Sequence, residues 1–557
     1  MSTLNSENID DPNKYEYPNW YSPETGIYNS THPPRNLPSD TFLDVVSFLF
    51  SCQHKGVSAL IDASSGVSIP YSELYSSVKS MASGLHSTGV TKGDVVLVML
   101  PNSIYFPVVL LGVLHSGAIF TPMNPLSSVT EIEKRVADCK PCLAFTVPEK
   151  VDIFRKLGVA AIGVPDQNVS LGDFLDFSKL ISSDYNLASR PLIMQEDTAA
   201  IMYSSGTTGL SKGVVLSHGN FIAMIELFVR FEASQYDYPS SEIVYLAVLP
   251  MFHVYGLAYF AMGLFSLGST VVVMRKFDMN EVARAVEKYR VTHIAAVPPI
   301  LTALTKAAKN NGGKSFRSLK QVSSGAAPPS RKMIEELVQV FPHVDFIQGY
   351  GMTESTAIGT RGFNTKNCRD YSSAGLLAPN TQAKVVDWKT GSLLPPGNSG
   401  ELWLRGPGVM KGYLNNDSTT MSSIDKDGWL RTGDIAYFDQ NGYLYIVDRL
   451  KEMIKYKGFQ IAPADLEAVL ASHPEILDVG VTAVMDEDCG EIPVAFVVRK
   501  QGSSLCHEDV INHVARQMSV LAGCTVQEDQ KGGIYKFDTQ ISGRKNPPER
   551  TQGVLNF

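Results

Sequence analysis

Short strand-like apolar runs alternate with helix-like runs through much of this 557-residue chain. Strand-like runs lie at residues 95–99, 118–120, 143–146, 242–249, 270–274, 293–297 and 321–323. Helical apolar spacing marks residues 71–88, 129–138, 278–289, 299–310 and 330–341. This alternation predicts parallel α/β layers. From residue 383 the pattern becomes all-strand, and a compact α+β segment starts near residue 451.

The length of the chain predicts several packed subdomains around more than one core. We predict a large α/β N-terminal domain with a β-rich subdomain at residues 39–449. A small α+β C-terminal cap domain is expected at residues 450–557. Residues 1–38 are rich in Asn, Pro, Ser and Tyr and show little periodicity, so we expect an irregular N-terminal arm there.

The composition excludes several classes of protein. Hydrophobic residues make up 44% of the chain and charged residues 19%, as in ordinary globular proteins. The net charge of −8 argues against a nucleic-acid partner. No run approaches the ~20 apolar residues of a transmembrane helix, and the polar N-terminus resembles no secretory signal. Seven cysteines, an odd and small number, favour a reducing compartment, so we expect a cytoplasmic location. We also expect a monomer.

Residues 203–214 read Tyr-Ser-Ser-Gly-Thr-Thr-Gly-Leu-Ser-Lys-Gly-Val, between strand-like runs at 198–202 and 214–216. Glycines let backbone N–H groups approach an anion, hydroxyls add donors and the lysine adds a positive charge. No Gly-Lys-Ser/Thr opens a helix, so this is not a Walker loop. A surface hairpin is the plain structural alternative. The pattern predicts a phosphate site formed by Ser204, Ser205, Gly206, Thr207, Thr208, Gly209 and Lys212.

The same segment resembles the nucleotide-phosphate signature of the adenylate-forming enzymes. That superfamily contains acyl-CoA synthetases, beetle luciferases and peptide-synthetase adenylation domains. Three further stretches resemble the plant 4-coumarate–CoA ligase-like enzymes in particular. They are Glu-Leu-Trp-Leu-Arg-Gly-Pro from residue 401, Tyr-Lys-Gly-Phe-Gln-Ile-Ala-Pro-Ala from residue 456 and Cys-Gly-Glu-Ile-Pro from residue 489. The matches run in family order from about residue 40 to residue 500.

The resemblance implies a nucleotide site built from two further motifs. Residues 348–354 read Gln-Gly-Tyr-Gly-Met-Thr-Glu, in which a tyrosine can stack on a purine and a carboxylate can bind Mg²⁺. By resemblance, Tyr350 stacks on adenine, Thr353 contacts phosphate and Glu354 is the metal ligand. A carboxylate can accept from both ribose hydroxyls. The other nucleotide contacts implied are Gln348, Gly349, Asp434 and Arg449.

The acyl and CoA sites are implied by the resemblance alone. A lone histidine is usually structural and three lysines in seven residues can form a solvated face, but both lie in motifs that match the family. His253 is expected to orient or stabilise the carboxylate. The expected acyl-binding residues are Tyr255, Tyr259, Ala326 and Gly351. Lys455 and Gln460 are expected to act near the adenylate, Lys276, Lys457 and Gly458 to contact CoA, and Lys451 to be the hinge of the cap.

The implied reaction has two halves. A carboxylate attacks the α-phosphorus of ATP and gives acyl-AMP and pyrophosphate, and the CoA thiol then attacks the acyl carbon and releases AMP. Mg²⁺ offsets charge on the phosphates, and the cap rotates between the halves. A hydroxycinnamate-like, fatty or jasmonate-precursor acid stays open as the substrate. A luciferase-like oxygenase and a peptide-synthetase module fit less well, because no carrier domain follows and the resemblance favours CoA.

The tail departs from the family, whose members end with Pro-Lys-Ser-x-x-Gly-Lys. The resemblance implies that the second lysine bridges carboxylate and phosphate during adenylation. No such motif occurs here, and the sequence after residue 518 is rich in Gly, Gln and Asp. We expect the last ~40 residues to be poorly folded. Adenylation is then impaired, and an adenylation-impaired ligand-binding or regulatory paralogue is the alternative function.

Codon degeneracy suggests an origin for residues 519–557. The reading ACC-CAA-ATC-TCC-GGC-CGG-AAA-A permitted for residues 539–545, taken one nucleotide later, encodes Pro-Lys-Ser-Pro-Ala-Gly-Lys. The codons that follow permit Ile-Leu-Arg. Our hypothesis is a frame-shifted reading of an intact gene or a frame-disrupted variant. The last codons permit Thr-Ser-Lys, so an intact frame ending in Ser-Lys-Leu predicts a peroxisomal location.

Overall fold

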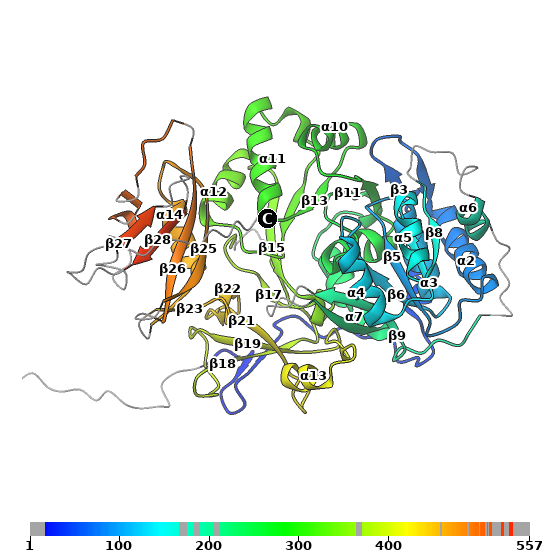
Figure 1. Cartoon of the computed structure of the whole chain (residues 1–557), viewed down its shortest axis with the longest axis horizontal. Helices are drawn as coiled ribbons and strands as arrows, with labels where there is room; N and C mark the ends of the chain where they lie inside the picture. Colours follow the sequence, from blue (N-terminus) through cyan, green and yellow to red (C-terminus); the bar gives the residue numbers. More distant parts are fainter. Residues whose placement is uncertain are drawn as a thin grey trace, which may run out of the picture. The chain divides into compact units, whose positions relative to one another are not determined.

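A computed structural model describes residues 17–165, 175–182, 190–204, 211–363, 370–456, 459–486 and 490–500, with short stretches at 502–506, 509–510, 512–514, 525–528 and 534–538. The chain divides into two compact units, Met1–Ile446 and Val447–Phe557. Layers of helices and sheets make up the first unit (Figure 1), and the α/β class predicted from the sequence is confirmed. None of the helices in these ranges combines the length and the apolar character that a bilayer crossing needs.

The first sheet of the large unit has seven strands in the order β20-β10-β9-β6-β5-β7-β8. They are β5 (Val95–Met99), β6 (Ile119–Pro122), β7 (Leu143–Thr146), β8 (Ala160–Gly163), β9 (Thr198–Ser204), β10 (Lys212–Ser217) and β20 (Gly412–Tyr413). The neighbouring strands β8, β7, β5, β6 and β9 are parallel, whereas β10 is antiparallel to β9. The connecting helices are α3 (Tyr105–His115), α4 (Val129–Cys139), α5 (Val151–Lys156) and α6 (Leu175–Ile181), and α2 (Tyr71–Ser87) precedes β5.

The second sheet has nine strands in the order β17-β16-β15-β14-β13-β11-β12-β3-β4. They are β3 (Ser58–Asp62), β4 (Ser68–Pro70), β11 (Val244–Ala247), β12 (Thr270–Val273), β13 (His293–Ala296), β14 (Gln321–Ser324), β15 (Asp345–Tyr350), β16 (Thr360–Arg361) and β17 (Leu376–Leu377). In this sheet the neighbouring strands β15, β14, β13, β11, β12 and β3 are parallel, so their carboxyl ends meet at one edge. Helices α10 (Met279–Tyr289), α11 (Pro298–Asn311) and α12 (Arg331–Val340) connect them.

Two helical rods contain π-helical turns, which are rare and are frequent near functional sites. The first comprises α7 (His218–Met224), η4 (Ile225–Arg230) and α8 (Phe231–Ala233), and the second comprises α9 (Val254–Gly256), η6 (Leu257–Met262) and η7 (Gly263–Leu267). Their aromatic side chains touch, since the rings of Phe228 and Tyr259 lie 5.2 Å apart. This unit also contains helix α1 (Val45–Phe50) and the 3₁₀ turns η1 (Pro148–Lys150), η5 (Ser240–Glu242), η8 (Lys314–Phe316) and η9 (Thr353–Ser355).

A third sheet contains part of the segment that we expected to be irregular. Its order is β1-β2-β18-β19-β21-β22, with β1 (Tyr21–Ser22) and β2 (Ile27–Asn29) from the N-terminal segment. The others are β18 (Gln382–Val386), β19 (Gly400–Arg405), β21 (Leu430–Phe438) and β22 (Leu444–Arg449). Tyr28 is fully buried and stacks on Phe438 at 4.6 Å. Two short strands therefore form within the segment expected to be irregular, and helix α13 (Asp417–Ser423) interrupts the region expected to be all strand.

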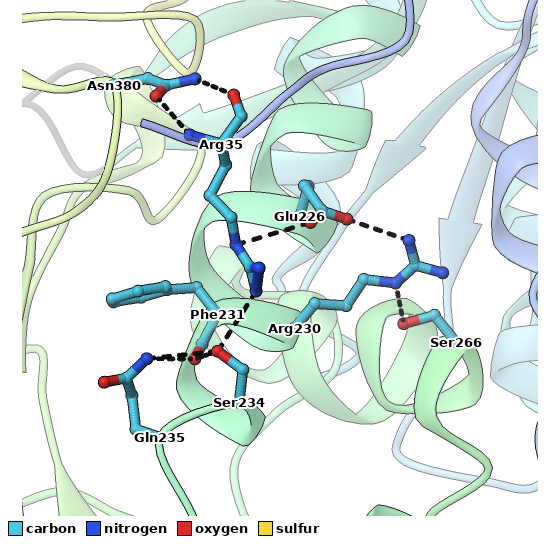
Figure 2. Close-up of polar contacts among 8 residues, drawn as sticks. All are labelled: Arg35, Glu226, Arg230, Phe231, Ser234, Gln235, Ser266 and Asn380. Carbon is cyan, nitrogen blue, oxygen red and sulfur yellow. Dashed lines mark hydrogen bonds and ion pairs between the residues drawn. The ribbon is translucent and has the colours of Figure 1, made fainter. Parts of the chain in front are cut away.

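Arg35 fastens the N-terminal segment to two distant parts of the unit (Figure 2). Its backbone N–H donates to Asn380 Oδ1 at 2.9 Å, and Asn380 Nδ2 donates to its carbonyl at 2.7 Å. Its guanidinium Nε lies 3.6 Å from Glu226, and Nη2 donates to Ser234 at 3.2 Å. Glu226 also pairs with Arg230 at 3.0 Å. These contacts join the segment to the loop before β18 and to the first helical rod.

The small unit is built on one sheet, which contains part of the atypical tail. Its strands are β23 (Ile454–Tyr456), β24 (Phe459–Ile461), β25 (Ile476–Asp486), β26 (Gly490–Arg499), β27 (Thr525–Glu528) and β28 (Ile534–Asp538), and its helix α14 spans Pro463–Ala471. Strand β28 pairs antiparallel with β26 and with β27. Two short strands therefore form within the region expected to be poorly folded, and residues 539–557 lie outside the described residues.

A buried histidine makes the stability of the large unit sensitive to acid. His218 is fully buried and its Nδ1 accepts from the backbone N–H of Val45 at 3.3 Å. Burial lowers the pKa of His218 to about 4. The charged groups that act on it are Asp44, Asp197, Arg190 and Lys92.

We expect His218 to lower the free energy of unfolding as the pH falls from 6.5 towards 4. In that window the unfolded chain binds a proton on this residue and the folded chain does not, so stability falls by about 1.4 kcal/mol per pH unit, or about 3 kcal/mol in all. Chemical denaturation of the wild type and of His218→Gln at pH 7, 5.5 and 4.5 measures this. The variant should show the shallower dependence, and parallel curves would contradict the assignment.

Candidate active site

A buried carboxylate joins the ends of strands from two sheets. Ser204 is the last residue of β9, and its hydroxyl donates to Glu354 Oε1 at 2.9 Å. Tyr413, in β20, donates to the same oxygen at 3.1 Å. Glu354 is 6% exposed and follows β15, where its backbone carbonyl accepts from the N–H of Met410 at 2.9 Å. Ligands of open α/β sheets bind beyond the carboxyl ends of strands, and Glu354 lies there.

The surroundings of Glu354 fit a magnesium ion that is shared with a substrate. Both hydrogen bonds made by described residues go to Oε1, which leaves Oε2 as a ligand atom. Within the described ranges, no cluster of three His, Cys, Asp or Glu residues forms a metal cage. Mg²⁺ is usually held by one or two carboxylates, with water and substrate phosphates as its other ligands.

Lys212 lies near Tyr413, one of the two residues that donate hydrogen bonds to Glu354. It is the first residue of β10, opposite Ser204 in the β9–β10 register, so it belongs to the strand and not to the loop before it. Its Nζ lies 5.1 Å from the ring centroid of Tyr413. The predicted phosphate-binding residues Ser205, Gly206, Thr207, Thr208 and Gly209 lie outside the described residues.

The residue before Ser204 is held by groups that sequence reasoning did not single out. The Tyr203 hydroxyl donates to Asp138 Oδ2 at 2.5 Å. The guanidinium of Arg135 lies 3.3 Å from the centroid of the Tyr203 ring. Asn415 donates to the backbone carbonyl of Asp138 at 3.2 Å. These contacts fix the end of β9, which immediately precedes the predicted phosphate-binding residues 205–209.

Two predicted nucleotide-binding residues meet directly. The hydroxyl of Tyr350, at the end of β15, donates to Asp434 Oδ2 at 2.5 Å. Burial and the neighbouring Asp434 carboxylate both raise the pKa of Tyr350 well above its usual value, so the phenol stays protonated. Gln348 donates from Nε2 to the carbonyl of Tyr371 at 2.7 Å, and Thr353 is half-buried in the turn next to Glu354.

Some positions in these motifs are occupied by small residues because a larger side chain would collide with backbone or buried groups. A Cβ on Gly351 would lie 2.4 Å from the carbonyl oxygen of Ala357, and one on Gly349 would lie 2.9 Å from Arg361 Nη1. Ala326, after β14, is exposed and has φ of +68°. The close approach at Gly349 and Gly351 therefore depends on the lack of a side chain.

His253, Tyr255 and Tyr259, which are expected at or beside the acyl group, lie after β11 and along the second helical rod. His253 immediately precedes α9 and part of its side chain is exposed to solvent. Desolvation by the surrounding protein lowers the pKa of its imidazole, so it is neutral near pH 7. Tyr255 is half-buried, with its hydroxyl 3.3 Å from Ser323 Oγ. Tyr259 is 1% exposed and its hydroxyl donates to Glu232, so its phenol group is already engaged inside the protein.

The remaining predicted residues are spread over both units. Lys276 is exposed in the bend after β12 of the large unit. In the small unit Lys455 and Gln460 stand opposite each other in the β23–β24 register. Arg449 and Lys451 are exposed, and Arg449 Nη1 lies 3.5 Å from a carboxylate oxygen of Glu452. Lys457 and Gly458 lie outside the described residues.

Comparison with known proteins identifies the family. Residues 51–414 match the family model of AMP-binding enzymes, and residues 465–526 match that of their C-terminal domain. The chain is 60% identical over 506 residues to 4-coumarate–CoA ligase-like 6 of Arabidopsis thaliana, covering 90% of this chain and 89% of that protein. It is 43% identical over 502 residues to peroxisomal OPC-8:0-CoA ligase 1 of the same plant, covering 88% and 90%.

A solved structure agrees with these relatives. It is o-succinylbenzoate–CoA synthetase of Bacillus subtilis in complex with ATP and a magnesium ion, with a TM-score of 0.71, 25% identity and coverage of 83% of this chain and 90% of that one. The chain belongs to the AMP-binding family of adenylate-forming enzymes. Close relatives are 4-coumarate–CoA ligase-like proteins, as the sequence resemblance implied.

Proposed function

We propose that this protein is an ATP-dependent carboxylate–CoA ligase that works in two steps, acyl-adenylate formation and thioester formation. Membership of the AMP-binding family supports an acid–thiol ligase. The observation that carries the proposal is the Glu354 carboxylate, held by Ser204 and Tyr413 at the strand ends where a nucleotide binds in this fold class. ATP and CoA are the co-substrates.

In the first step, the residues of the large unit bind and orient ATP. Ser204 and Lys212, with the loop at 205–209, contact the phosphates, and Thr353 donates to a phosphate oxygen. Glu354 holds Mg²⁺, which neutralises phosphate charge when bound. Tyr350 packs on adenine and donates to Asp434, whose carboxylate is proposed to accept from the ribose hydroxyls. Gln348 and Gly349 complete the proposed nucleotide contacts of the large unit, and Arg449, in the small unit, is also proposed as a nucleotide contact.

In the second step, the proposed roles divide between the two units. Neutral His253 orients the acyl carboxylate before the second step, during adenylation, because a histidine with a lowered pKa can donate a hydrogen bond without carrying a charge. Tyr255, Tyr259, Ala326 and Gly351 surround the acyl group. Lys455 and Gln460 act at the adenylate, while Lys276, Lys457 and Gly458 bind CoA. Lys451 is the proposed hinge that lets the small unit serve both steps.

The acid that is activated is proposed to be a hydroxycinnamate-like, fatty or jasmonate-precursor acid. Support comes from relatives named 4-coumarate–CoA ligase-like and OPC-8:0-CoA ligase. We expect one of these classes to stimulate AMP release above the rate without acid when ATP, Mg²⁺ and CoA are present. The test is a screen of acids with the protein carrying the restored tail motif. If no acid of the three classes stimulated release, the proposed substrate range would be wrong.

The alternative is a ligand-binding or regulatory paralogue with impaired adenylation. It is favoured by the lack of Pro-Lys-Ser-x-x-Gly-Lys in residues 519–557. A paralogue of this kind binds nucleotide but does not turn a supplied acyl-AMP into a thioester. Transcript sequencing decides whether a shift of frame restores the motif. It also shows whether the frame ends in Ser-Lys-Leu, which would favour a peroxisomal location over a cytoplasmic one. One relative is named as a peroxisomal ligase.

A further inference from the structure

Tyr413 reaches two charged groups of the proposed nucleotide site, although it belongs to none of the motifs that predicted the site. It lies in the two-residue strand β20 and is half-buried. Its hydroxyl donates to Glu354 Oε1 at 3.1 Å, and the centroid of its ring lies 5.1 Å from Lys212 Nζ. The hydroxyl and the ring of one side chain therefore act on a carboxylate and on an ammonium group.

The register of the first sheet explains why these side chains meet. Tyr413 stands opposite Val214, and Lys212 stands opposite Ser204. Lys212 and Val214 are two residues apart on β10, so their side chains lie on the same face of the sheet. Tyr413, Lys212 and Ser204 therefore gather on one face, at the end of β9.

The backbone around Tyr413 is tied to both of the elements that its side chain reaches. The N–H of Leu414 donates to the carbonyl of Gly213 at 2.7 Å, which holds this segment against β10. The N–H of Met410 donates to the carbonyl of Glu354 at 2.9 Å, which holds it against the turn after β15. The phenol of Tyr413 is thus placed by backbone contacts between the two charged groups.

We propose that Tyr413 is a positioning residue of the nucleotide site, whose hydroxyl orients the Glu354 carboxylate for Mg²⁺ and whose ring holds Lys212 ready for phosphate. The proposal rests on the ligase function and on the metal-binding role of Glu354 proposed above. A phenol is protonated at neutral pH, and hydrogen bonds of this kind orient metal-binding carboxylates. The face of an aromatic ring attracts an ammonium group, and holding the lysine beforehand lowers the cost of ordering it when phosphate binds.

Binding of α,β-methylene-ATP separates the two roles and requires no adenylation, because this analogue cannot release pyrophosphate. Calorimetry on the full chain measures its affinity in EDTA and in saturating Mg²⁺. In the wild type, Mg²⁺ should tighten binding. Tyr413→Phe keeps the ring and loses the hydroxyl, so the gain from Mg²⁺ should fall by about tenfold while the affinity in EDTA stays unchanged.

Tyr413→Leu removes the ring as well as the hydroxyl. Its gain from Mg²⁺ should fall as in Tyr413→Phe, and its affinity in EDTA should also fall, by about twofold to tenfold. Lys212→Met provides the background that tests the cause of this second loss. With no cation left for the ring to hold, adding Tyr413→Leu to Lys212→Met should lower the affinity in EDTA no further.

Tyr289→Phe is the matched control, because Tyr289 makes a similar pair of contacts at the end of α10. The Tyr289 hydroxyl donates to the carbonyl of Ala63 at 3.1 Å, and Lys288 Nζ lies 4.7 Å from the centroid of its ring. Neither contact involves a residue of the proposed site. This variant should keep both wild-type affinities.

The outcomes separate this inference from the proposed function. A full gain from Mg²⁺ in Tyr413→Phe, or an equal loss of affinity with and without Mg²⁺, would overturn the role of the hydroxyl. An unchanged affinity of Tyr413→Leu in EDTA would overturn the role of the ring. If the wild type did not bind the analogue, or bound it no more tightly with Mg²⁺, the proposed nucleotide and metal sites would fail together with this inference.

Discussion

Restoring Pro-Lys-Ser-Pro-Ala-Gly-Lys at residues 539–545 is expected to raise ATP–pyrophosphate exchange by about 10²–10³ over the chain as given. The change returns a cation to the charge that develops between carboxylate and α-phosphate. Lys212 cannot take over this role, because it is fixed at the start of β10, where it lies near Tyr413. The measurement is acid-dependent exchange of labelled pyrophosphate into ATP for both proteins.

The matched control for this experiment is the restored chain with the second lysine of the motif changed to methionine. It should fall back to the rate of the chain as given, while nucleotide binding stays similar in all three proteins. Equal exchange by the chain as given and the restored chain would contradict impaired adenylation. The last residues would then contribute nothing to catalysis.

Glu354→Gln is expected to lower the rate of acyl-adenylate formation by about 10²–10³ and to raise the Mg²⁺ concentration needed for half-maximal rate. Glutamine keeps an acceptor for Ser204 and Tyr413 but removes the charge that holds the metal. Single-turnover formation of acyl-AMP in the restored protein, measured over a range of Mg²⁺ concentrations, checks both effects.

Glu336→Gln is the matched control, since Glu336 is exposed and paired with Lys309 at 2.6 Å. It should leave both the rate and the magnesium dependence as they are in the wild type. A Glu354→Gln protein that folds normally and keeps the wild-type magnesium dependence would refute the metal-binding role. The carboxylate would then serve only to join Ser204 and Tyr413.

Much of the fold follows from local patterns in the sequence. The strands at residues 95–99 and 143–146 are observed as β5 and β7 with the predicted bounds, because they are short buried runs that end at turns. The helix expected at residues 71–88 is α2. The N-terminal strands were missed because β2 gains its order from pairing with β18, far along the chain. Helix α13 was missed because its Ser- and Thr-rich sequence lacks an apolar period.

The site was predictable only where one motif carries the chemistry. Ser204 and Glu354 lie in recognisable motifs, and the structure brings them into contact. The part played by Tyr413 depends on β20 pairing with β10, which no local pattern shows. The buried ion pair between Arg361 and Glu232 was not predicted for a related reason. A charged residue in a sequence predicts a solvent-exposed side chain unless its partner is known, and these two partners come from separate elements.

The most direct test of the proposed function is the second half-reaction alone. Acyl-AMP of an acid identified by the screen is mixed with CoA and the chain as given, and the acyl-CoA thioester and released AMP are measured by mass spectrometry. A carboxylate–CoA ligase is expected to form thioester in step with AMP, at similar rates with and without the restored tail. Acyl-AMP that binds and is not consumed would contradict the ligase function and would leave a ligand-binding protein.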